Sequence, residues 1–343
     1  MDKSTSPLAR GASYLLIYLT AFQPLHPAFA AGITAANGNT QVVIKPGNVP
    51  VVNIATPNGA GISHNTYKDF NVGPQGAVLN NATHGGKTQL GVEIYSAQGN
   101  TYLKGKPAEL IINEVIGGSR SELQGKLEVF GSKANVMIAN PNGITCNGCG
   151  FINAPGVTLT TGKPQLNADG SVAGYQVERG VVRIEGGGLN GDTRHDTEYV
   201  DILARAVEVN AGVWAKEGVS VVAGRNRVSA DGKTAAPLSD DGSARPELAI
   251  DMGQMGGMYS GSIRMIGTEA GVGVRNQGGQ VRAGKTLTVS SEGKLSWRSD
   301  APTQAGGDIQ LAAKGDIETH GKVYSGGQLA VQSREGMLTQ SST

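Results

Sequence analysis

Aromatic and charged residues are scarce in this 343-residue chain. Aromatics make up 5 % of it and charged residues 17 %, whereas a soluble globular domain carries about 25 % charged residues. The 29 basic and 28 acidic residues give a net charge of +1. Because no basic stripe is present to replace counterions on a phosphate backbone, we expect no nucleic acid partner. The chain also lacks the run of about 20 apolar residues that a membrane-spanning helix requires.

Glycine, in contrast, is abundant. The chain contains 52 glycines, about twice the usual share of about 7 %. So many glycines indicate many turns and close backbone approaches. With few large rings available, a narrow core of Val, Ile, Leu and Ala repeated along an axis is favoured.

The amino terminus is typical of an export signal. Lys3 and Arg10 form a charged region, residues 14–19 begin a short apolar stretch, and a small-x-small pattern ends at Ala30. This order predicts cleavage between Ala30 and Ala31. We therefore expect residues 1–30 to be a signal peptide and the mature chain to be exported.

The last third of the chain contains short repeats in which apolar residues alternate with polar or small ones. Their first apolar residues, Ile263, Leu287, Ile309 and Leu329, are 20–24 residues apart. That period is too short for propeller blades of about 40–45 residues, and the helix and Leu/Asn consensus of leucine-rich repeats are missing. Stacked coils of a parallel β-helix fit better, because neighbouring coils share one core and satisfy each other's backbone groups.

Alternation also predicts which side chains fill this core. The residues expected to face inward are Ile263, Met265, Leu287, Val289, Ile309 and Leu311. No window keeps a helical apolar period without an interrupting Gly or Pro, so the expected fold class is all-β. About 310 mature residues at about 22 per coil allow at most about 14 coils.

Changes in strand pattern and in repeat regularity along the chain suggest four segments. We expect a signal peptide at 1–30, an amino-terminal cap with the first coils at 31–100, β-helix at 101–260, and further repeats at 261–343 that continue beyond the end of the chain. Asp-Gly turns between alternating flanks predict hairpin insertions near 163–179 and 226–248, both outside the rod.

The most specific motif is Asn140-Pro141-Asn142-Gly143-Ile144. Proline presets φ at the second position of a β-turn, and Asn and Gly suit the positions that follow. The residues alone therefore predict a turn between two coils.

This motif and its surroundings resemble the two-partner-secretion (TpsA) domain of filamentous haemagglutinins, secreted haemolysins and contact-dependent growth-inhibition toxins. Segments that match in the family's order include 49–54, 61–65, 70–72, 127–131 and 221–226. The resemblance implies a right-handed parallel β-helix, or solenoid, with amino-terminal capping strands and extra-helical hairpins. It implies that Asn140 to Ile144 form the family's secretion motif, by which a partner is recognised.

The resemblance also implies the partners. The inner-membrane general secretion machinery would deliver the chain to the periplasm of a Gram-negative bacterium. The periplasmic POTRA modules of an outer-membrane transporter (TpsB) would then bind it and export it to the cell surface. Receptors on host or neighbouring cells would be partners of the full-length protein.

A second family motif is present only in degenerate form. Where the family has Asn-Pro-Asn-Leu, this chain has Asn100-Thr101-Tyr102-Leu103. Loss of the proline and of the second asparagine removes the preset turn. Either a different turn forms here or partner recognition is altered, so we assign no binding role to Thr101 or Tyr102.

Cys146 and Cys149 are the only cysteines. A lone C-x-x-C provides too few ligands for zinc, which prefers four, and a thioredoxin-like context is absent. In an oxidising compartment a small disulfide is the first expectation, and buried free thiols are the alternative. We expect neither a metal ion nor a cofactor.

One cluster resembles a catalytic site. Asp192, Arg194, His195, Asp196 and Glu198 lie close together after a glycine-rich stretch. Carboxylates and a base in a β-helix could serve a polysaccharide lyase, but a solvated loop explains the same residues and fold alone does not imply function. We therefore expect no enzyme and keep two alternatives to a secretion domain: an adhesin that binds host glycans, and a lyase.

Overall fold

The computed structural model describes residues 32–192 and 196–341, and the predicted cleavage site at Ala30 and Ala31 lies outside these residues. In the described part nearly every regular element is a β-strand, the one exception being the short 3-10 turn η1 (Thr101–Leu103). No helix in this part is long and apolar enough to cross a membrane. The expected all-β class is confirmed.

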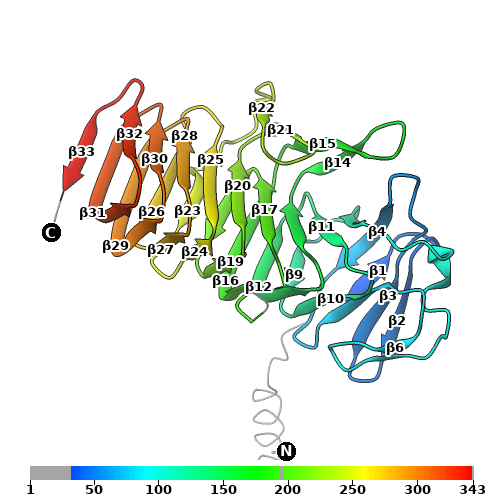
Figure 1. Cartoon of the computed structure of the whole chain (residues 1–343). Helices are drawn as coiled ribbons and strands as arrows, with labels where there is room; N and C mark the ends of the chain where they lie inside the picture. The colour runs from blue at the N-terminus through cyan, green and yellow to red at the C-terminus, as the bar shows by residue number, and fades with distance from the viewer. Residues whose placement is uncertain (1–31, 193–195, 342–343) are drawn as a thin grey trace, which may run out of the picture. The chain divides into compact units, whose positions relative to one another are not determined.

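One long sheet forms a face of the rod (Figure 1). Its first strand, β1, runs antiparallel to β4, and from β4 onward ten strands pair in parallel. The ten parallel strands are fewer than the maximum of about 14 coils, because the cap and the hairpins also use residues. In order along the rod, its strands are β1 (Ile33–Ala35), β4 (Ile62–Phe70), β8 (Leu110–Val115), β11 (Asn135–Ala139), β13 (Gly156–Thr160), β17 (Tyr199–Ala204), β20 (Gly218–Ala223), β25 (Ser262–Gly267), β28 (Leu287–Ser291), β30 (Ile309–Ala313) and β32 (Leu329–Ser333).

A second large sheet supplies the other sides of the coils. At the amino-terminal end β2 and β3 pair antiparallel and form part of the cap, and β3 continues in parallel to β5. Its strands are β2 (Gln41–Lys45), β3 (Val49–Asn53), β5 (Ala77–Asn81), β9 (Ser121–Leu123), β10 (Lys126–Gly131), β12 (Ile144–Ile152), β16 (Val181–Leu189), β18 (Ala206–Val209), β19 (Gly212–Trp214), β23 (Leu248–Met252), β24 (Gly257–Ser260), β26 (Gly273–Gln277), β27 (Gln280–Ala283), β29 (Leu295–Ala305), β31 (Ile317–Ser325) and β33 (Leu338–Ser341). A separate ribbon of β6 (Gly86–Lys87) and β7 (Glu93–Ile94) lies in the cap region.

The core follows the predicted alternation. All six side chains expected to face inward in the last third are at most 1 % exposed, whereas Gln310, between two of them, is exposed. Ile263, Leu287 and Ile309 are direct neighbours on successive strands. The in-register stacking explains why a chain with few aromatics can still form a continuous core.

The two predicted insertions join into one extra-helical sheet rather than standing as separate hairpins. β14 (Lys163–Leu166) and β15 (Val172–Val177) form the first hairpin, β21 (Asn226–Ser229) and β22 (Ala235–Pro237) form the second, and β15 pairs with β21. Tyr175 and Val228 of this sheet share a buried apolar cluster with Met137 and Leu203 of the rod. The sheet therefore lies on the outer face of the coils, as Figure 1 shows above β17 and β20.

Candidate functional site

The secretion motif forms a tight turn between β11 and β12. The Gly143 amide donates a hydrogen bond of 3.0 Å to the Asn140 carbonyl oxygen, which defines a four-residue β-turn. Pro141 occupies the second turn position, where its fixed φ is suited. Ile144, the first residue of β12, is fully buried and anchors the turn to the core.

The Asn140 side chain ties this turn to the preceding coil. It is fully buried, and its Oδ1 accepts a hydrogen bond from the Asn142 backbone amide at 2.9 Å. Its Nδ2 donates to the Ser119 carbonyl oxygen at 2.9 Å and to Ser121 Oγ at 3.0 Å. Asn140 is thus an internal crosslink between two coils and is inaccessible from outside the folded domain.

The Asn142 side chain also connects the turn to neighbouring segments of the chain. Its Nδ2 donates to the Gly117 carbonyl oxygen at 2.8 Å, and its Oδ1 accepts from Arg179 at 3.3 Å. Because Gly117 precedes the turn and Arg179 lies just before β16, Asn142 links three consecutive stretches of the chain. It is half-buried, so part of its side chain faces solvent.

Gly143 is required by both conformation and space. Its φ is +111°, a region that side chains rarely adopt. An added Cβ would contact the Arg120 guanidinium and would lie 2.9 Å from the Val181 carbonyl oxygen. Arg120 donates to that carbonyl and to Thr145 Oγ1, and burial, followed by the nearby Arg183 charge, lowers the pKa of its guanidinium.

The degenerate second motif also forms a turn headed by a buried asparagine. The Leu103 amide donates to the Asn100 carbonyl oxygen at 3.2 Å, and Asn100 Oδ1 accepts from the Tyr102 amide at 3.1 Å. Asn100 Nδ2 donates to the carbonyl oxygens of Ile54 and Asn80 at 2.9 and 3.0 Å. These contacts resemble those of Asn140, except that Asn140 Nδ2 donates to one carbonyl oxygen and one serine hydroxyl.

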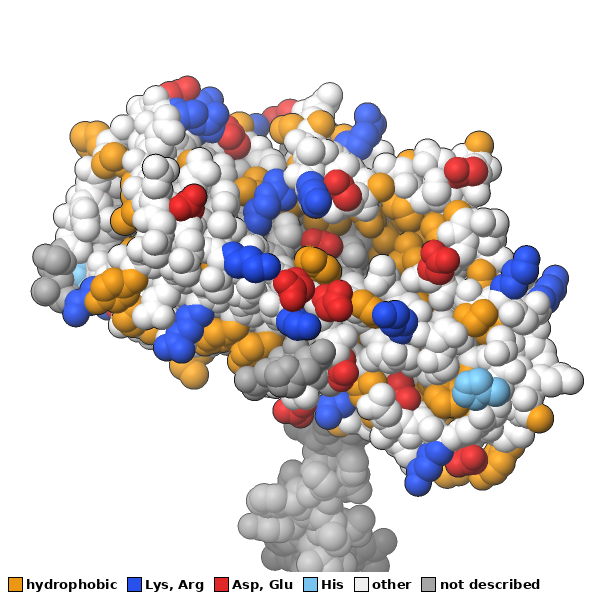
Figure 2. All heavy atoms as spheres, in the orientation of Figure 1, with side chains coloured by type: hydrophobic (Ala, Val, Ile, Leu, Met, Phe, Trp, Pro, Cys, Tyr) orange, Lys and Arg blue, Asp and Glu red, His pale blue; other side chains and the backbone are white. Residues whose placement is uncertain are grey.

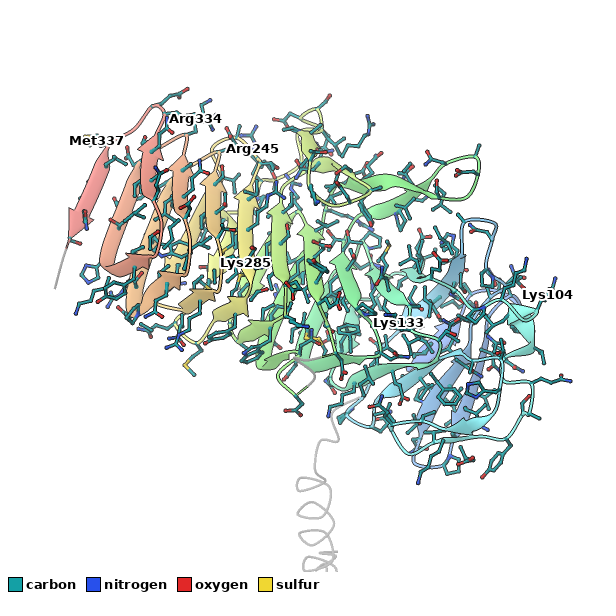
Figure 3. All side chains as sticks on the ribbon, viewed as in Figure 1. Lys104, Lys133, Arg245, Lys285, Arg334 and Met337 are labelled. Atoms are coloured by element: carbon teal, nitrogen blue, oxygen red, sulfur yellow. A yellow bond between two sulfur atoms is a disulfide. The ribbon has the colours of Figure 1, made fainter. Side chains whose placement is uncertain are left out.

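Proline is therefore dispensable for this second turn. The side chains of both Asn100 and Leu103 are at most 2 % exposed. Lys104, labelled in Figure 3, follows at φ 51° and points away from the domain. The sequence left open whether a different turn forms here or partner recognition is altered. The structure contains a 3-10 turn capped by Asn100.

The two cysteines are joined in a disulfide across a turn within β12. Their side chains are buried, and Asn147 and Gly148 between them are exposed. The closed loop is short, so little chain entropy is removed from the unfolded state. Replacing both cysteines by alanine, which adds no polar group to the core, is expected to lower the free energy of unfolding by about 2 kcal/mol. Urea titrations of both proteins under oxidising conditions test this value, and a failure to fold would contradict it.

The cluster at 192–198 does not form a catalytic constellation in the described residues. Asp192 is 84 % exposed and lies 3.8 Å from Lys126, and Asp196 and Glu198 are also exposed. Arg194 and His195 lie outside the described residues. Among the residues that are described, no group of three or more His, Cys, Asp or Glu side chains could hold a metal ion.

Sequence reasoning missed a buried polar network near the cap. Asn65 and Asn113 are fully buried neighbours on β4 and β8, and Asn65 accepts hydrogen bonds from Thr40 Oγ1 and the Ala55 amide. Tyr67 donates to Asn113 Oδ1 at 2.9 Å, and burial raises the pKa of its hydroxyl. The available signal was Ser63, Asn65 and Tyr67 occupying alternate positions of β4, in the phase that apolar residues occupy elsewhere.

A cap, a parallel β-helix, an extra-helical sheet and two asparagine-headed turns together define a secretion domain of the filamentous haemagglutinin type. The crystal structure of the filamentous hemagglutinin secretion domain superposes on this chain with a TM-score of 0.72 and 34 % sequence identity. The match covers 91 % of this chain and all of that one. Residues 30–297 match the family model described as the TPS secretion domain, and the chain belongs to that family.

The most similar relatives are very long proteins. This chain is 50 % identical over 328 residues to the 16S rRNA endonuclease CdiA of Enterobacter cloacae subsp. cloacae, and 48 % identical over 336 residues to a tRNA nuclease CdiA of Escherichia coli. The matches cover 94 % and 96 % of this chain but 10 % of each relative, so the chain spans about a tenth of their length. Exoproteins with this domain are secreted through the periplasm to the surface of Gram-negative bacteria, and this is the chain's destination.

Proposed function

We propose that this chain directs a longer exoprotein, of the haemagglutinin or contact-dependent-inhibition kind, through a dedicated outer-membrane transporter (TpsB). The observation that carries the proposal is the coextensive match to a haemagglutinin secretion domain, at 34 % identity over the whole of that domain. The nuclease names of the relatives describe proteins of which this chain spans about a tenth. We infer that this segment addresses the exoprotein to its transporter and performs no catalysis.

Burial of the motif residues indicates when recognition takes place. Asn140 and Ile144 are fully buried in the folded domain, so a partner protein can contact their side chains only before the coils close. We infer that the POTRA modules bind the extended, unfolded chain in the periplasm. The same residues would then lock the turn outside the cell.

Coil-by-coil folding supplies a reason for export to proceed in one direction. Beyond the cap, each new coil pairs in parallel with the previous one. In such one-dimensional stacks, folding can propagate from an existing coil. Every coil that forms outside the cell adds a barrier to return through the channel.

A secretion assay tests the proposal. We expect the chain to appear in the medium only when a matched transporter is co-expressed, and to accumulate in the periplasm when the POTRA modules are deleted. Immunoblots of medium and periplasm measure both pools, and an unrelated exported protein without this domain is the control. Equal amounts in the medium with and without the transporter would overturn the proposal.

A further inference from the structure

Four side chains on the outer face of the rod are apolar. They alternate along β8, β11, β17 and β20 with residues of the main core, so they point away from it, and they are Ile112, Met137, Leu203 and Val222. Each is nevertheless at most 1 % exposed, because Tyr175, Val177 and Val228 of the extra-helical sheet pack on them. Figure 2 shows hydrophobic side chains gathered between this sheet and the cap end of the rod.

The outer apolar row ends where the extra-helical sheet ends. Val222 is the direct neighbour of the half-buried Ile266 on β25, and the same row then continues through Ser290, Ala312 and Gln332 on the next three coils. Small and polar residues at these later positions need no cover from water. Outward apolar side chains and the layer that covers them therefore occupy the same stretch of the rod.

Two hydrogen bonds fasten the extra-helical sheet at its opposite ends. Asn58, in the loop before β4, donates from Nδ2 to the Gly170 carbonyl oxygen in the turn of the first hairpin at 2.9 Å. Arg264 on β25 donates to the Lys233 carbonyl oxygen in the turn of the second hairpin at 2.7 Å. The sheet is thus attached to the rod from the loop before β4 as far as β25.

This sheet is assembled from two segments that are far apart in the sequence. β15 pairs with β21 in antiparallel register, and β16 to β20 lie between them in the chain. Until β21 is in place, β15 has an unpaired edge and Val228 is missing from the cover. The sheet can therefore close only after the coils of β16 to β20 are available.

We propose that the extra-helical sheet is a latch that joins the coils of β4 to β25 into one cooperative unit. In a simple stack each coil is coupled only to its neighbours, so distant coils open independently. A layer that packs on β8, β11, β17 and β20 at once has to detach before any of these strands can separate, which couples their opening. The coils from β28 onward lie outside the latch and open separately.

The latch also has a consequence for export, which rests on the function proposed above. Because β21 and β22 follow the coils that they fasten, the latch closes only after residues 226–237 have reached the outside of the cell. Earlier coils remain able to open until that point. Closure then opposes their return through the channel.

Hydrogen–deuterium exchange of the purified mature chain, read by mass spectrometry, tests the proposal. Val228→Ala removes the γ-methyl groups at the centre of the latch and leaves every residue of the rod unchanged. We expect amide exchange in β8 and β20 to become at least about tenfold faster, together with exchange in β15 and β21, and exchange in β30 to stay within about twofold. Val331→Ala, at a half-buried valine on β32 beyond the latch, is the matched control and should leave β8 and β20 unchanged.

Two results would overturn the proposal. One is unchanged exchange in β8 and β20, whatever happens in the extra-helical sheet itself. The other is equal acceleration of every strand including β30, because the unit would then have no boundary after β25. The purified chain is measured without a transporter, so either result leaves the proposed function standing, and a failed secretion assay leaves the latch standing.

A milder variant keeps the test decisive if Val228→Ala fails to fold. Asn58→Asp retains the oxygen that accepts from the Ala60 and Ile62 amides but loses the donor to the Gly170 carbonyl oxygen. We expect exchange in β8 and β20 to become about threefold faster in this variant. Asn39→Asp, at an exposed asparagine of the cap, is its control, and equal exchange in the two variants would contradict the latch.

Discussion

An Asn140→Ala variant is expected to lose about 3 kcal/mol of unfolding free energy. The substitution leaves the Asn142 amide, the Ser119 carbonyl and the Ser121 hydroxyl without their present partner. Ser121 is buried, Asn142 is half-buried and Ser119 is exposed, and a buried group left unsatisfied costs about 1–3 kcal/mol. Because the crosslink joins two coils, its loss should weaken the stack on both sides of the turn.

Urea unfolding followed by circular dichroism measures this effect in the mature chain. Asn147→Ala is the matched control, since Asn147 is exposed and, within residues 32–192 and 196–341, its side chain accepts a single long hydrogen bond, from the Gly187 amide at 3.3 Å. The control should change stability by less than about 0.5 kcal/mol. An Asn140→Ala loss below about 1 kcal/mol would mean that water replaces the asparagine and that the crosslink is not structural.

The motif could act in secretion by closing the turn in the folded domain or by being recognised by the transporter. Two experiments distinguish these roles. If Asn140 acts mainly by closing the turn outside the cell, Asn100→Ala should slow secretion in the same way, since the Asn100 side chain also closes its own turn and donates to neighbouring segments. If the Asn140 side chain is itself recognised by the transporter, binding of the unfolded chain to isolated POTRA modules should weaken only in the Asn140 variant. Pulse-chase secretion and a pull-down measure the two quantities.

Repeat spacing and alternation were sufficient to predict the rod. Ile263, Leu287 and Ile309 follow one another at nearly constant spacing, and the structure places them in direct register. Each coil is specified locally by a short strand and a glycine turn, so local pattern and global fold agree. Architecture was therefore accessible from the sequence, because the residues alone also indicated an amino-terminal cap and two insertions outside the rod.

The pairing of strands that are far apart in the sequence could not be predicted from local sequence patterns. Both insertions were predicted as hairpins from their Asp-Gly turns, but nothing local indicates that Gln176 pairs with Arg227. That pairing joins the insertions into one sheet. The register of Asp201, Ser220 and Arg264 was hidden for the same reason, because these residues become neighbours only when coils of unequal length stack. The second motif shows the reverse case: the missing proline and second asparagine left open whether a different turn forms, and the structure contains a 3-10 turn capped by Asn100.

Asp201 should make the stability of the domain depend on pH. Burial raises the pKa of its carboxyl from the ordinary 3.8 to about 6; Arg264 opposes this shift, and Asp231 adds to it. The folded state therefore holds this proton more tightly than the unfolded state. The contribution of Asp201 is neutral below about pH 4, becomes increasingly destabilising as the pH rises toward 6, and is constant above that.

Replacing the carboxylate by an amide removes this penalty without changing the shape of the side chain. Asp201→Asn is expected to raise the unfolding free energy by about 3 kcal/mol at pH 7.5 and to leave it nearly unchanged at pH 4. Urea titrations of both proteins between pH 4 and 8 measure the difference, and Asp192→Asn, at an exposed position, should show none at any pH. A variant that is less stable than the unmodified chain at pH 7.5 would contradict the prediction, because it would mean that the ionised Asp201 carboxylate stabilises the docked turn of the extra-helical sheet.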